Sequence, residues 1–284
     1  MREERSIQSI KKPRTALEGA GVKIARVFGF ADTKLMDPFL LLDEFGSEKP
    51  SEFEKGFPWH PHRGIETITY MFEGKARHRD STGGKGVIEP GAIQWMTAGS
   101  GIIHEEMPES DTGTVRGLQL WLNLPAKEKM TPPKYRGYKA SEFPEVTTSE
   151  GARIKIIAGS VNGVRGPIRG IKTEPEYLDI FLPEGCEITH STNPLHKVFA
   201  YIMEGSGTFS SDNDMPIESQ SLVLYKSGSY VTIRAEDSSL RFVLVSAMPL
   251  GEPIAWQGPI VMNTEKELQT AFREYREGTF IKHT

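Results

Sequence analysis

Segments with the composition of β-strands recur through this sequence roughly every 8 to 12 residues, with glycine-rich turns between them. Residues 22–28 alternate apolar and polar side chains, which is the period of a half-buried strand, and residues 66–74 combine β-branched and aromatic side chains before a glycine. The spacing typical of helices is almost absent before residue 264. Many short strands joined by tight turns are typical of a barrel or sandwich, so the sequence predicts an all-β protein.

The length and an internal similarity predict two domains. A chain of 284 residues corresponds to about two globular domains of ordinary size. Residues 66–74 and 197–205 are both aromatic-rich segments that end in Glu-Gly, which indicates an internal duplication. The prolines of residues 125–144 interrupt the strand pattern, so this segment is expected to be a linker. We therefore expect domains at residues 1–130 and 131–284.

Composition and charge exclude several classes of protein. The net charge of −4 and the isoelectric point of about 6.0 argue against a protein that coats nucleic acid, which normally presents a basic face. The single Cys186 excludes an internal disulfide framework and suits a reducing compartment. We find neither an apolar run of membrane-spanning length nor the apolar core of a signal peptide. We expect a soluble, cytoplasmic protein that contacts neither a membrane nor nucleic acid directly.

Both ends of the chain carry a pattern. Residues 1–14 are basic and are expected to form a solvated lead-in to the first strand, with contact to an acidic partner as the alternative. Residues 264–275 place apolar side chains at intervals of 3 and 4, behind Thr264 and Glu267 in the arrangement of a capping box. This pattern predicts a short C-terminal helix.

Two histidines stand two positions apart, at His60 and His62, in a segment that has the composition of a strand. Side chains at such spacing on a strand point to the same face, and neutral imidazole is the commonest protein ligand for metals of intermediate softness. His104 and Glu106 repeat this spacing 42 positions after His62, whereas Glu105 has the opposite parity and should face away. The two pairs together predict a metal site of three imidazoles and one carboxylate.

The spacing of the residues leaves alternatives to this ligand set open. Glu66 shares the parity of the first histidine pair if the strand runs unbroken, which makes it a rival to Glu106, but Gly64 is a candidate bulge that would shift the facing by one. His78 lies in a charged, alternating segment and is taken to lack a partner two positions on, so it is expected at the surface or behind the ligands. Any single histidine also has an ordinary packing or surface role as its alternative.

The second half of the chain lacks such pairs. His190 and His196 are six positions apart, and no further histidine pair follows. Residues such as Phe199, Tyr201 and Met203 are expected to fill the face on which the first half carries its ligands. The sequence therefore predicts one metal site, in the N-terminal domain, and none in the C-terminal domain.

Large apolar side chains accompany the predicted ligands along the sequence. They are Phe57, Trp59, Phe72, Trp95 and Met96. A pocket lined by such residues at a barrel mouth would suit a planar aromatic ligand, although each of them is also an ordinary core residue.

Four segments together resemble one known family. They are PWHPHRG at residues 58–64, GAIQWMTAGSGIIHEEMP at 91–108, GLQLWLNLP at 117–125 and GPIVMNTEKELQTAFREY at 258–275. They resemble the pirin family, the two-domain members of the cupin superfamily, and the resemblance extends from about residue 14 to residue 275. It implies a bicupin fold of two stacked β-barrels, each of them a double-stranded β-helix jelly roll, with a short C-terminal helix.

The resemblance also implies a ligand set, which favours Glu106 over Glu66. The family's ligands fall on His60, His62, His104 and Glu106. One divalent metal ion per chain is implied, in the N-terminal barrel only and usually iron, and such a donor set suits Fe(II), Mn, Co, Ni, Cu and Zn. The sequence departs from the general cupin pattern at Thr97, where the second cupin motif usually has proline.

Two functions from different classes follow from the resemblance, because pirins are described both as flavonol (quercetin) 2,3-dioxygenases and as nuclear transcription co-regulators. We expect an enzyme that opens a flavonol-type ring with O2, with a small planar aromatic substrate and with Glu106 as both ligand and general base. The alternative is a redox-responsive, metal-binding regulatory module that has a protein partner and no turnover. A third option is a metal-stabilised barrel for a small carboxylate or sugar.

Overall fold

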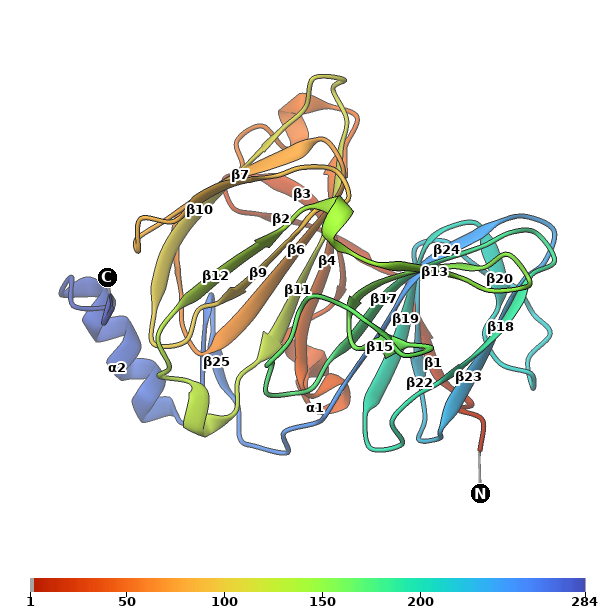
Figure 1. Cartoon of the computed structure of the whole chain (residues 1–284). Coiled ribbons are helices and arrows are strands. Elements are labelled where there is room, and N and C mark those ends of the chain that lie inside the picture. The colour runs from red at the N-terminus through yellow and green to blue at the C-terminus, as the bar shows by residue number, and fades with distance from the viewer. Residues whose placement is uncertain (1–2, 284) are drawn as a thin grey trace. The chain divides into compact units, whose positions relative to one another are not determined.

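The strands of this protein form antiparallel sheets that belong to two separate units (Figure 1). The computed structural model describes residues 3–283. Unit 1 consists of residues 1–13 and 141–249, and unit 2 consists of residues 14–140 and 250–284. Each unit contains one seven-stranded and one four-stranded sheet.

Unit 2 carries most of the N-terminal half of the chain. Its long sheet has the order β12-β9-β6-β11-β4-β3-β2 and its short sheet the order β5-β10-β7-β8. The strands of the long sheet are β2 (Arg14–Glu18), β3 (Val22–Phe28), β4 (Phe39–Ser47), β6 (Ile65–Glu73), β9 (Ile93–Thr97), β11 (Val115–Asn123) and β12 (Lys134–Tyr138). Those of the short sheet are β5 (Phe57–His62), β7 (Lys75–Asp80), β8 (Lys85–Ile88) and β10 (Ile102–Glu109). In Figure 1, β7 and β10 cross one face of the long sheet, which leaves an interior between the two sheets.

Unit 1 repeats this arrangement. Its long sheet has the order β1-β22-β19-β24-β17-β14-β13, and its short sheet the order β18-β23-β20-β21. The strands of the long sheet are β1 (Ile7–Lys11), β13 (Glu145–Thr147), β14 (Arg153–Ala158), β17 (Glu176–Leu182), β19 (Lys197–Glu204), β22 (Ser221–Tyr225) and β24 (Leu240–Ala247). Those of the short sheet are β18 (Glu187–Ser191), β20 (Ser206–Thr208), β21 (Ile217–Glu218) and β23 (Tyr230–Ala235), and a separate ribbon pairs β15 (Ser160–Val161) with β16 (Val164–Arg165).

Helices are few and short. The predicted C-terminal helix is confirmed as α2 (Glu265–Arg276), and its capping box is formed because Thr264 Oγ1 accepts from Glu267 N at 3.3 Å and Glu267 Oε2 accepts from Thr264 N at 2.9 Å. Before α2, the strands β25 (Ala255–Gln257) and β26 (Ile260–Met262) form a hairpin. The remaining short helices are α1 (Thr33–Met36), η1 (Phe30–Asp32), η2 (Pro50–Glu52), η3 (Ala126–Glu128) and η4 (Ala140–Glu142).

The all-β prediction is confirmed, with one correction to its geometry. Each unit pairs two distinct sheets in a jelly-roll arrangement instead of closing one sheet into a barrel. The long and short sheets of a unit share no ladder of hydrogen bonds in the described part of the chain. Side chains packed between the two sheets therefore hold them together.

The composition of the two units differs from the linear division expected at residues 130 and 131. The strand β1 pairs with β22 in unit 1, and residues 250–284 return to unit 2. The expectation of a solvated lead-in was therefore wrong for residues 3–14. Met1 and Arg2 lie outside the described residues. Arg5 is buried, and its guanidinium donates to Thr192 Oγ1 at 2.8 Å and to the carbonyl oxygens of Lys226 and Asn193 at 2.7 Å each. These hydrogen bonds join the N-terminal segment to the rest of unit 1.

The expected linker at residues 125–144 contains a strand of unit 2. Within it, β12 pairs with β9 along its full length, from Lys134 opposite Thr97 to Tyr138 opposite Ile93. Pro132 and Pro133 stand before the strand, so they do not remove any donor from this ladder. The prediction of a linker was wrong for this part of the segment because the prolines mark only the entry to the strand.

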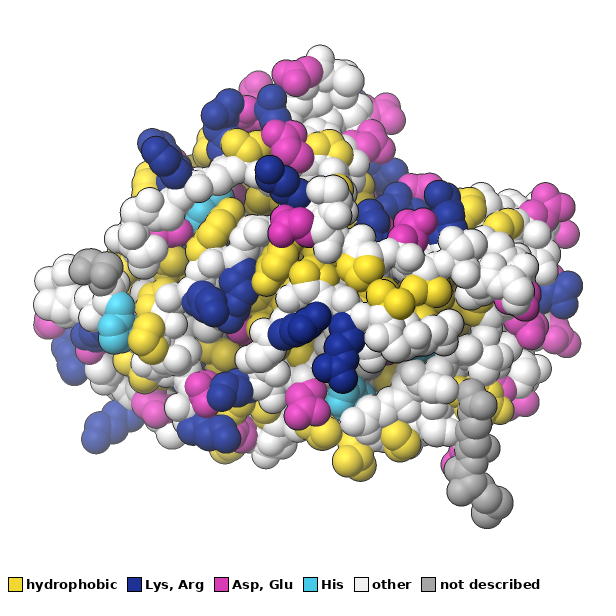
Figure 2. All heavy atoms as spheres, viewed as in Figure 1, with side chains coloured by type: hydrophobic (Ala, Val, Ile, Leu, Met, Phe, Trp, Pro, Cys, Tyr) yellow, Lys and Arg dark blue, Asp and Glu magenta, His cyan; other side chains and the backbone are white. Residues whose placement is uncertain are grey.

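Charges are mixed over the surface. Lys and Arg side chains lie among Asp and Glu side chains over the face that Figure 2 shows. This interspersion agrees with the small net charge of −4. Among residues 3–283, the structure has no helix with the length and apolar character needed to cross a bilayer.

Candidate metal centre

The histidines of β5 and β10 converge on one point of the interior of unit 2. The ladder between these strands places His104 directly opposite His60, and His62 opposite Ile102. The Nε2 atoms of His60 and His62 are 3.1 Å apart, and the ring centroids of His60 and His104 are 4.3 Å apart. One ring nitrogen from each of the three lies within 4.8 Å of the other two. The structure thus brings together the three imidazoles that the sequence selected.

The hydrogen bonds of His60 and His62 define which of their nitrogens carries the proton. His60 Nδ1 lies 2.8 Å from the carbonyl oxygen of Pro58, and His62 Nδ1 lies 3.1 Å from that of Pro259. Because a carbonyl oxygen can only accept, each Nδ1 carries the hydrogen, and each neutral ring presents a lone pair at Nε2. Such outer hydrogen bonds are the usual way in which proteins orient histidine ligands.

The resulting arrangement fits a divalent ion. Two lone pairs face each other at 3.1 Å between His60 and His62, and the buried Nε2 of His104 has no hydrogen-bond partner in the described structure. Two ligand nitrogens at about 2.1 Å from one ion and at a right angle to each other would be about 3.0 Å apart. A cation bound at this point would therefore satisfy all three nitrogens, which otherwise make an unfavourable buried contact.

Burial keeps two of these imidazoles neutral. Burial, with a smaller contribution from His60, lowers the pKa of His62 well below its usual value. Burial also lowers the pKa of His104 well below its usual value, with His62, His60 and His78 adding to the effect. The neutral form is the one that binds a metal, so the site is prepared for an ion at neutral pH.

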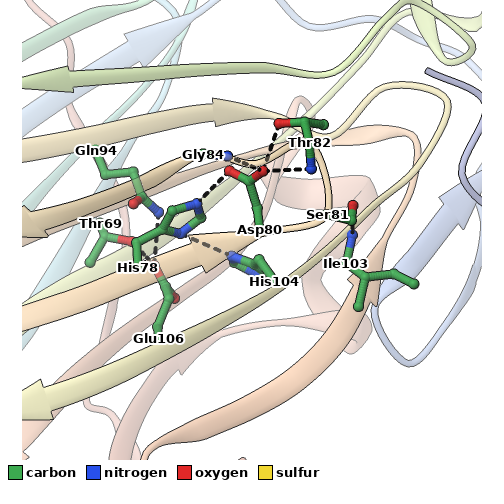
Figure 3. A network of polar contacts seen from close by, with 10 residues as sticks. All are labelled: Thr69, His78, Asp80, Ser81, Thr82, Gly84, Gln94, Ile103, His104 and Glu106. Atoms are coloured by element: carbon green, nitrogen blue, oxygen red, sulfur yellow. Dashed lines mark hydrogen bonds and ion pairs between the residues drawn. The ribbon is translucent and has the colours of Figure 1, made fainter. Parts of the chain in front are cut away.

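Glu106 lies beside His104, on the side that strand parity predicted. Its Oε1 accepts hydrogen bonds from Thr69 Oγ1 at 2.9 Å and from Gln94 Nε2 at 2.8 Å (Figure 3). It forms a second group of potential ligands with His78 and His104, again within 4.8 Å. The four predicted ligands are thus divided between two groups that share His104. Glu105 faces the other way and forms an ion pair with Arg79.

Glu66, the rival carboxylate, has a different role. It is buried on β6, where it accepts hydrogen bonds from Trp95 Nε1 at 3.1 Å and from Thr97 Oγ1 at 2.7 Å. The strand does not run unbroken from His62, because Gly64 adopts φ +78° between β5 and β6. A Cβ at Gly64 would lie 1.9 Å from the carbonyl oxygen of Val261, so the close approach requires glycine. Thr97, which stands where the general cupin pattern has proline, donates one of the two hydrogen bonds that hold Glu66.

His78 lies behind His104, which is the second of the two positions expected for it, and not at the surface. Its side chain is fully buried, with Nε2 2.8 Å from Asp80 Oδ2 and Nδ1 3.4 Å from His104 Nδ1. Its ring lies against that of Tyr135, with centroids 4.7 Å apart. The signal that could have found this contact is the spacing of His78 and Asp80, which repeats the two-residue interval of the other pairs.

A cavity of about 680 Å³ opens beside the histidines. Polar groups of His60, His62, Thr69, Glu106 and Gln119 line it. Its aromatic wall consists of Phe30, Phe45, Phe57, Trp121 and Trp256. The ring of Trp121 lies edge-on to that of His62, with centroids 5.0 Å apart, and Trp256 lies 6.0 Å from Trp121.

Of the aromatic residues expected around the ligands, only Phe57 lines this cavity. Trp95 and Met96 are buried on β9, where Trp95 donates to Glu66 and Met96 packs in an apolar cluster. Trp59 is 48% exposed, because it lies between His60 and Pro58 on the opposite side of β5. Phe72 packs beside Tyr70, with ring centroids 4.6 Å apart.

The histidines of unit 1 have ordinary partners. His190 Nε2 lies 2.8 Å from Glu176 Oε2, and His196 Nδ1 lies 3.1 Å from Ser246 Oγ. Within residues 3–283, both groups of potential metal ligands lie in unit 2. The expectation that the C-terminal domain binds no metal stays a prediction.

Comparison with known proteins places the whole chain among two-domain cupins. The pirin family model matches residues 21–122, and the model of the pirin C-terminal cupin domain matches residues 177–281. A Pseudomonas aeruginosa protein, provisionally named quercetin 2,3-dioxygenase, is 40% identical over 96% of this chain and 97% of its own length. Pirin-like protein 2 of Arabidopsis thaliana is 42% identical over 92% of this chain and 81% of its own. The crystal structure of quercetin 2,3-dioxygenase from Acinetobacter baumannii superposes with a TM-score of 0.89 and 30% identity, over 98% of both chains.

Proposed function

Because the chain belongs to the pirin family, we propose that it binds one divalent metal ion through His60, His62, His104 and Glu106 and uses it to open a flavonol-type ring with O2. The observation that carries this proposal is the convergence of three imidazoles beside an aromatic-lined cavity, whose wall includes His60 and His62. The relatives named quercetin 2,3-dioxygenase support the choice of substrate class. Fe(II) is the favoured ion, and the same donors also suit Mn, Co, Ni, Cu and Zn.

The cavity has the size and lining for a planar aromatic substrate. Its volume of about 680 Å³ lies within the usual range of small-molecule sites. Trp121 and Trp256 offer two aromatic faces next to His62, and Phe30 packs against Trp256 with ring centroids 5.6 Å apart. A flat ring held against these side chains would direct its hydroxyl groups toward the histidines and Glu106. When bound there, the metal supplies a Lewis acid for a substrate oxygen and a redox centre for O2.

Glu106 is the residue that would take up the substrate proton. Its Oε1 is held by Thr69 and Gln94, which leaves Oε2 to accept the proton of a substrate hydroxyl. Thr69 Oγ1 also lies 2.7 Å from Gln119 Oε1, and its single hydrogen can serve only one of the two acceptors at a time. When the hydrogen turns to Gln119, Glu106 keeps only the hydrogen bond from Gln94.

The proposal is tested by combining metal analysis with a measurement of oxygen consumption. Purified protein loaded with Fe(II), and separately with Mn, Co, Ni, Cu and Zn, is analysed for metal content and then mixed with a small panel of flavonols that includes quercetin. We expect about one ion per chain and oxygen uptake with at least one flavonol. If the fully metal-loaded protein consumes no oxygen with any flavonol of the panel, the proposed dioxygenase activity is contradicted. The protein would then be a metal-binding protein without turnover.

A further inference from the structure

The orientation of His104 cannot be set in the way that its two neighbours are set. The Nδ1 atoms of His60 and His62 each donate to a carbonyl oxygen, which fixes their tautomers. His104 Nδ1 instead lies 3.4 Å from Nδ1 of another imidazole, that of His78. Two neutral imidazoles can share a hydrogen bond in either direction. In one direction His104 presents a lone pair at Nε2, and in the other it presents an N–H there.

Asp80 decides between these directions because its carboxylate can only accept. Its Oδ2 lies 2.8 Å from His78 Nε2. Its Oδ1 accepts three further hydrogen bonds, from Thr82 N at 2.8 Å, Thr82 Oγ1 at 2.6 Å and Gly84 N at 3.1 Å (Figure 3). Backbone N–H groups can only donate, so Oδ1 is an acceptor toward Thr82 and Gly84, and Oδ2 is placed as the acceptor facing His78 Nε2.

We infer that Asp80 and His78 are positioning residues that fix the tautomer of His104, so that its Nε2 lone pair faces the metal site. The carboxylate accepts a hydrogen bond from His78 Nε2–H, so the neutral His78 ring has its lone pair on Nδ1. That lone pair accepts a hydrogen bond from His104 Nδ1–H, and His104 Nε2 is left with a lone pair that has no partner in the described structure. The inference rests on the proposed metal centre and adds the residues that orient one of its ligands.

The backbone around this chain of three residues is held in place on both sides. In the ladder between β7 and β10, Asp80 lies opposite His104. Just beyond it, Ser81 N donates to the carbonyl oxygen of Ile103 at 2.8 Å, and Ile103 N donates to Ser81 Oγ at 3.1 Å. A Cβ at Gly84 would lie 2.2 Å from Asp80 Oδ2, so a side chain there would displace the carboxylate from this position. The turn and the strand are thus fitted to one position of Asp80.

Asp80→Asn tests the inference because it keeps the shape and changes the direction of the hydrogen bonds. The three donors that surround Oδ1 would hold the amide oxygen of the asparagine, which turns its NH2 group toward His78 Nε2. His78 would then carry its hydrogen on Nδ1, and His104 would have to accept there and carry its own hydrogen on Nε2. The loss of such an outer partner typically lowers metal affinity by about 10- to 100-fold.

The measurement is a titration of the metal-free, full-length protein with Co(II) against a competing chelator. We expect Asp80→Asn to bind Co(II) about 10- to 100-fold more weakly than wild type, and the control Thr82→Val, which removes one hydrogen bond to the same carboxylate, to stay within about threefold. Thermal unfolding of the metal-free proteins checks that both variants fold. Equal affinities of Asp80→Asn and wild type, or an equal loss in Thr82→Val, would overturn the inference.

A second measurement uses the wild-type protein alone and so does not depend on how a variant folds. Nitrogen-15 NMR of the histidine rings in the metal-free protein at neutral pH should show hydrogen on Nε2 of His78 and on Nδ1 of His104. Hydrogen on Nε2 of His104 would overturn the inference. Neither measurement depends on turnover. If the protein binds Co(II) and shows these tautomers but consumes no oxygen, only the proposed dioxygenase activity is contradicted. If the wild type binds no Co(II), both the proposed metal centre and this inference are contradicted.

Discussion

The two units share a strand order but differ in what fills them. The long sheets correspond strand by strand, with β6, β11 and β4 at the centre of one and β19, β24 and β17 at the centre of the other. In the short sheet of unit 1, β18 and β23 direct Ile188, Val231 and Ile233 into a single large apolar cluster. In the short sheet of unit 2, β5 and β10 direct His60, His62 and Glu106 toward a cavity.

This difference shows how little of the scaffold has to change to make a site. Both pairs of strands use the same antiparallel ladder, and the side chains that point inward are exchanged from apolar to metal-binding. The exchange is unfavourable for folding, because a buried nitrogen without a partner, such as His104 Nε2, costs about 1 to 3 kcal/mol. A bound ion would offset that cost.

The largest effect is expected from removing the inward-facing histidines of β5. The double variant His60→Ala, His62→Ala loses two of the four proposed ligands, so its metal content should fall close to zero and its affinity by ~100-fold or more, a loss above that caused by an outer partner. Elemental analysis after loading with Fe(II) measures this. The matched double variant in unit 1, His190→Ala and His196→Ala, should bind as much metal as wild type. Full metal content in the variant of unit 2, or a loss of metal in the variant of unit 1, would contradict the proposal that unit 2 holds the metal site.

The next effect concerns the carboxylate of β10. Glu106→Gln keeps the size of the side chain and its contacts with Thr69 and Gln94 but removes the base, so the turnover number with a flavonol should fall by ~10² to 10⁴. The control is Glu105→Gln on the adjacent position, which faces Arg79 and should leave the turnover number unchanged. Oxygen uptake at saturating quercetin provides the rates. If the two variants have equal activity, Glu106 is not the base.

The parts of this architecture that could be predicted from the sequence depend on short-range periodicity. Strand parity is a property of neighbouring residues, and it placed His60, His62 and His104 together and separated Glu105 from Glu106. The cap of α2 is likewise encoded by four consecutive positions. The same rule applied to His78 and Asp80 predicts the contact behind His104, whereas the charged neighbours of His78 favour a surface position.

The parts that could not be predicted depend on where distant segments return. Trp256 and Pro259 reach the cavity from the β25–β26 hairpin, far along the chain from His62, and no local pattern indicates that residues 250–284 rejoin unit 2. The strand β1 joins unit 1 for the same kind of reason, because the edge of β22 is completed by a segment more than 200 residues away. Both pairings are contacts between remote segments, which strand periodicity does not encode.

A third prediction tests whether the apolar interior of unit 1 stabilises that unit by itself. Phe209 is fully buried and packs against Phe242 with ring centroids 5.4 Å apart, so Phe209→Ala should destabilise unit 1 by ~3 to 5 kcal/mol. All four tryptophans belong to unit 2, so tryptophan fluorescence follows that unit, while circular dichroism follows both. In urea titrations, Phe209→Ala should shift the transition followed by circular dichroism and leave the one followed by tryptophan fluorescence unchanged. The exposed Leu195→Ala should shift neither transition. A joint shift of both signals would mean that the units unfold as one.

The smallest expected effect comes from two buried cations, one taken from each unit. Arg5 in unit 1 and Lys129 in unit 2 are both about 1% exposed, and both donate to oxygen atoms. The ammonium of Lys129 bonds the carbonyl oxygens of Gly64 and Val261 at 2.8 and 2.9 Å and Asn123 Oδ1 at 2.7 Å. Burial lowers the pKa of Lys129 from 10.5 to about 7, against the opposing effect of Glu252 and Glu267. A guanidinium stays charged at any pH of interest, so only unit 2 should respond to pH through this group.

The direction of that response follows from proton binding. Between pH 7 and 10.5 the unfolded chain holds the proton of Lys129 more tightly than the folded one, so the free energy of unfolding of unit 2 should rise as the pH increases through this range and level off below pH 7. Urea titrations at pH 7 and pH 9, followed by tryptophan fluorescence, measure the rise. In Lys129→Met this contribution should vanish, whereas in Arg5→Met the rise should persist. Equal pH dependence in wild type and Lys129→Met would show that the three oxygen acceptors compensate for burial and that the two cations behave alike.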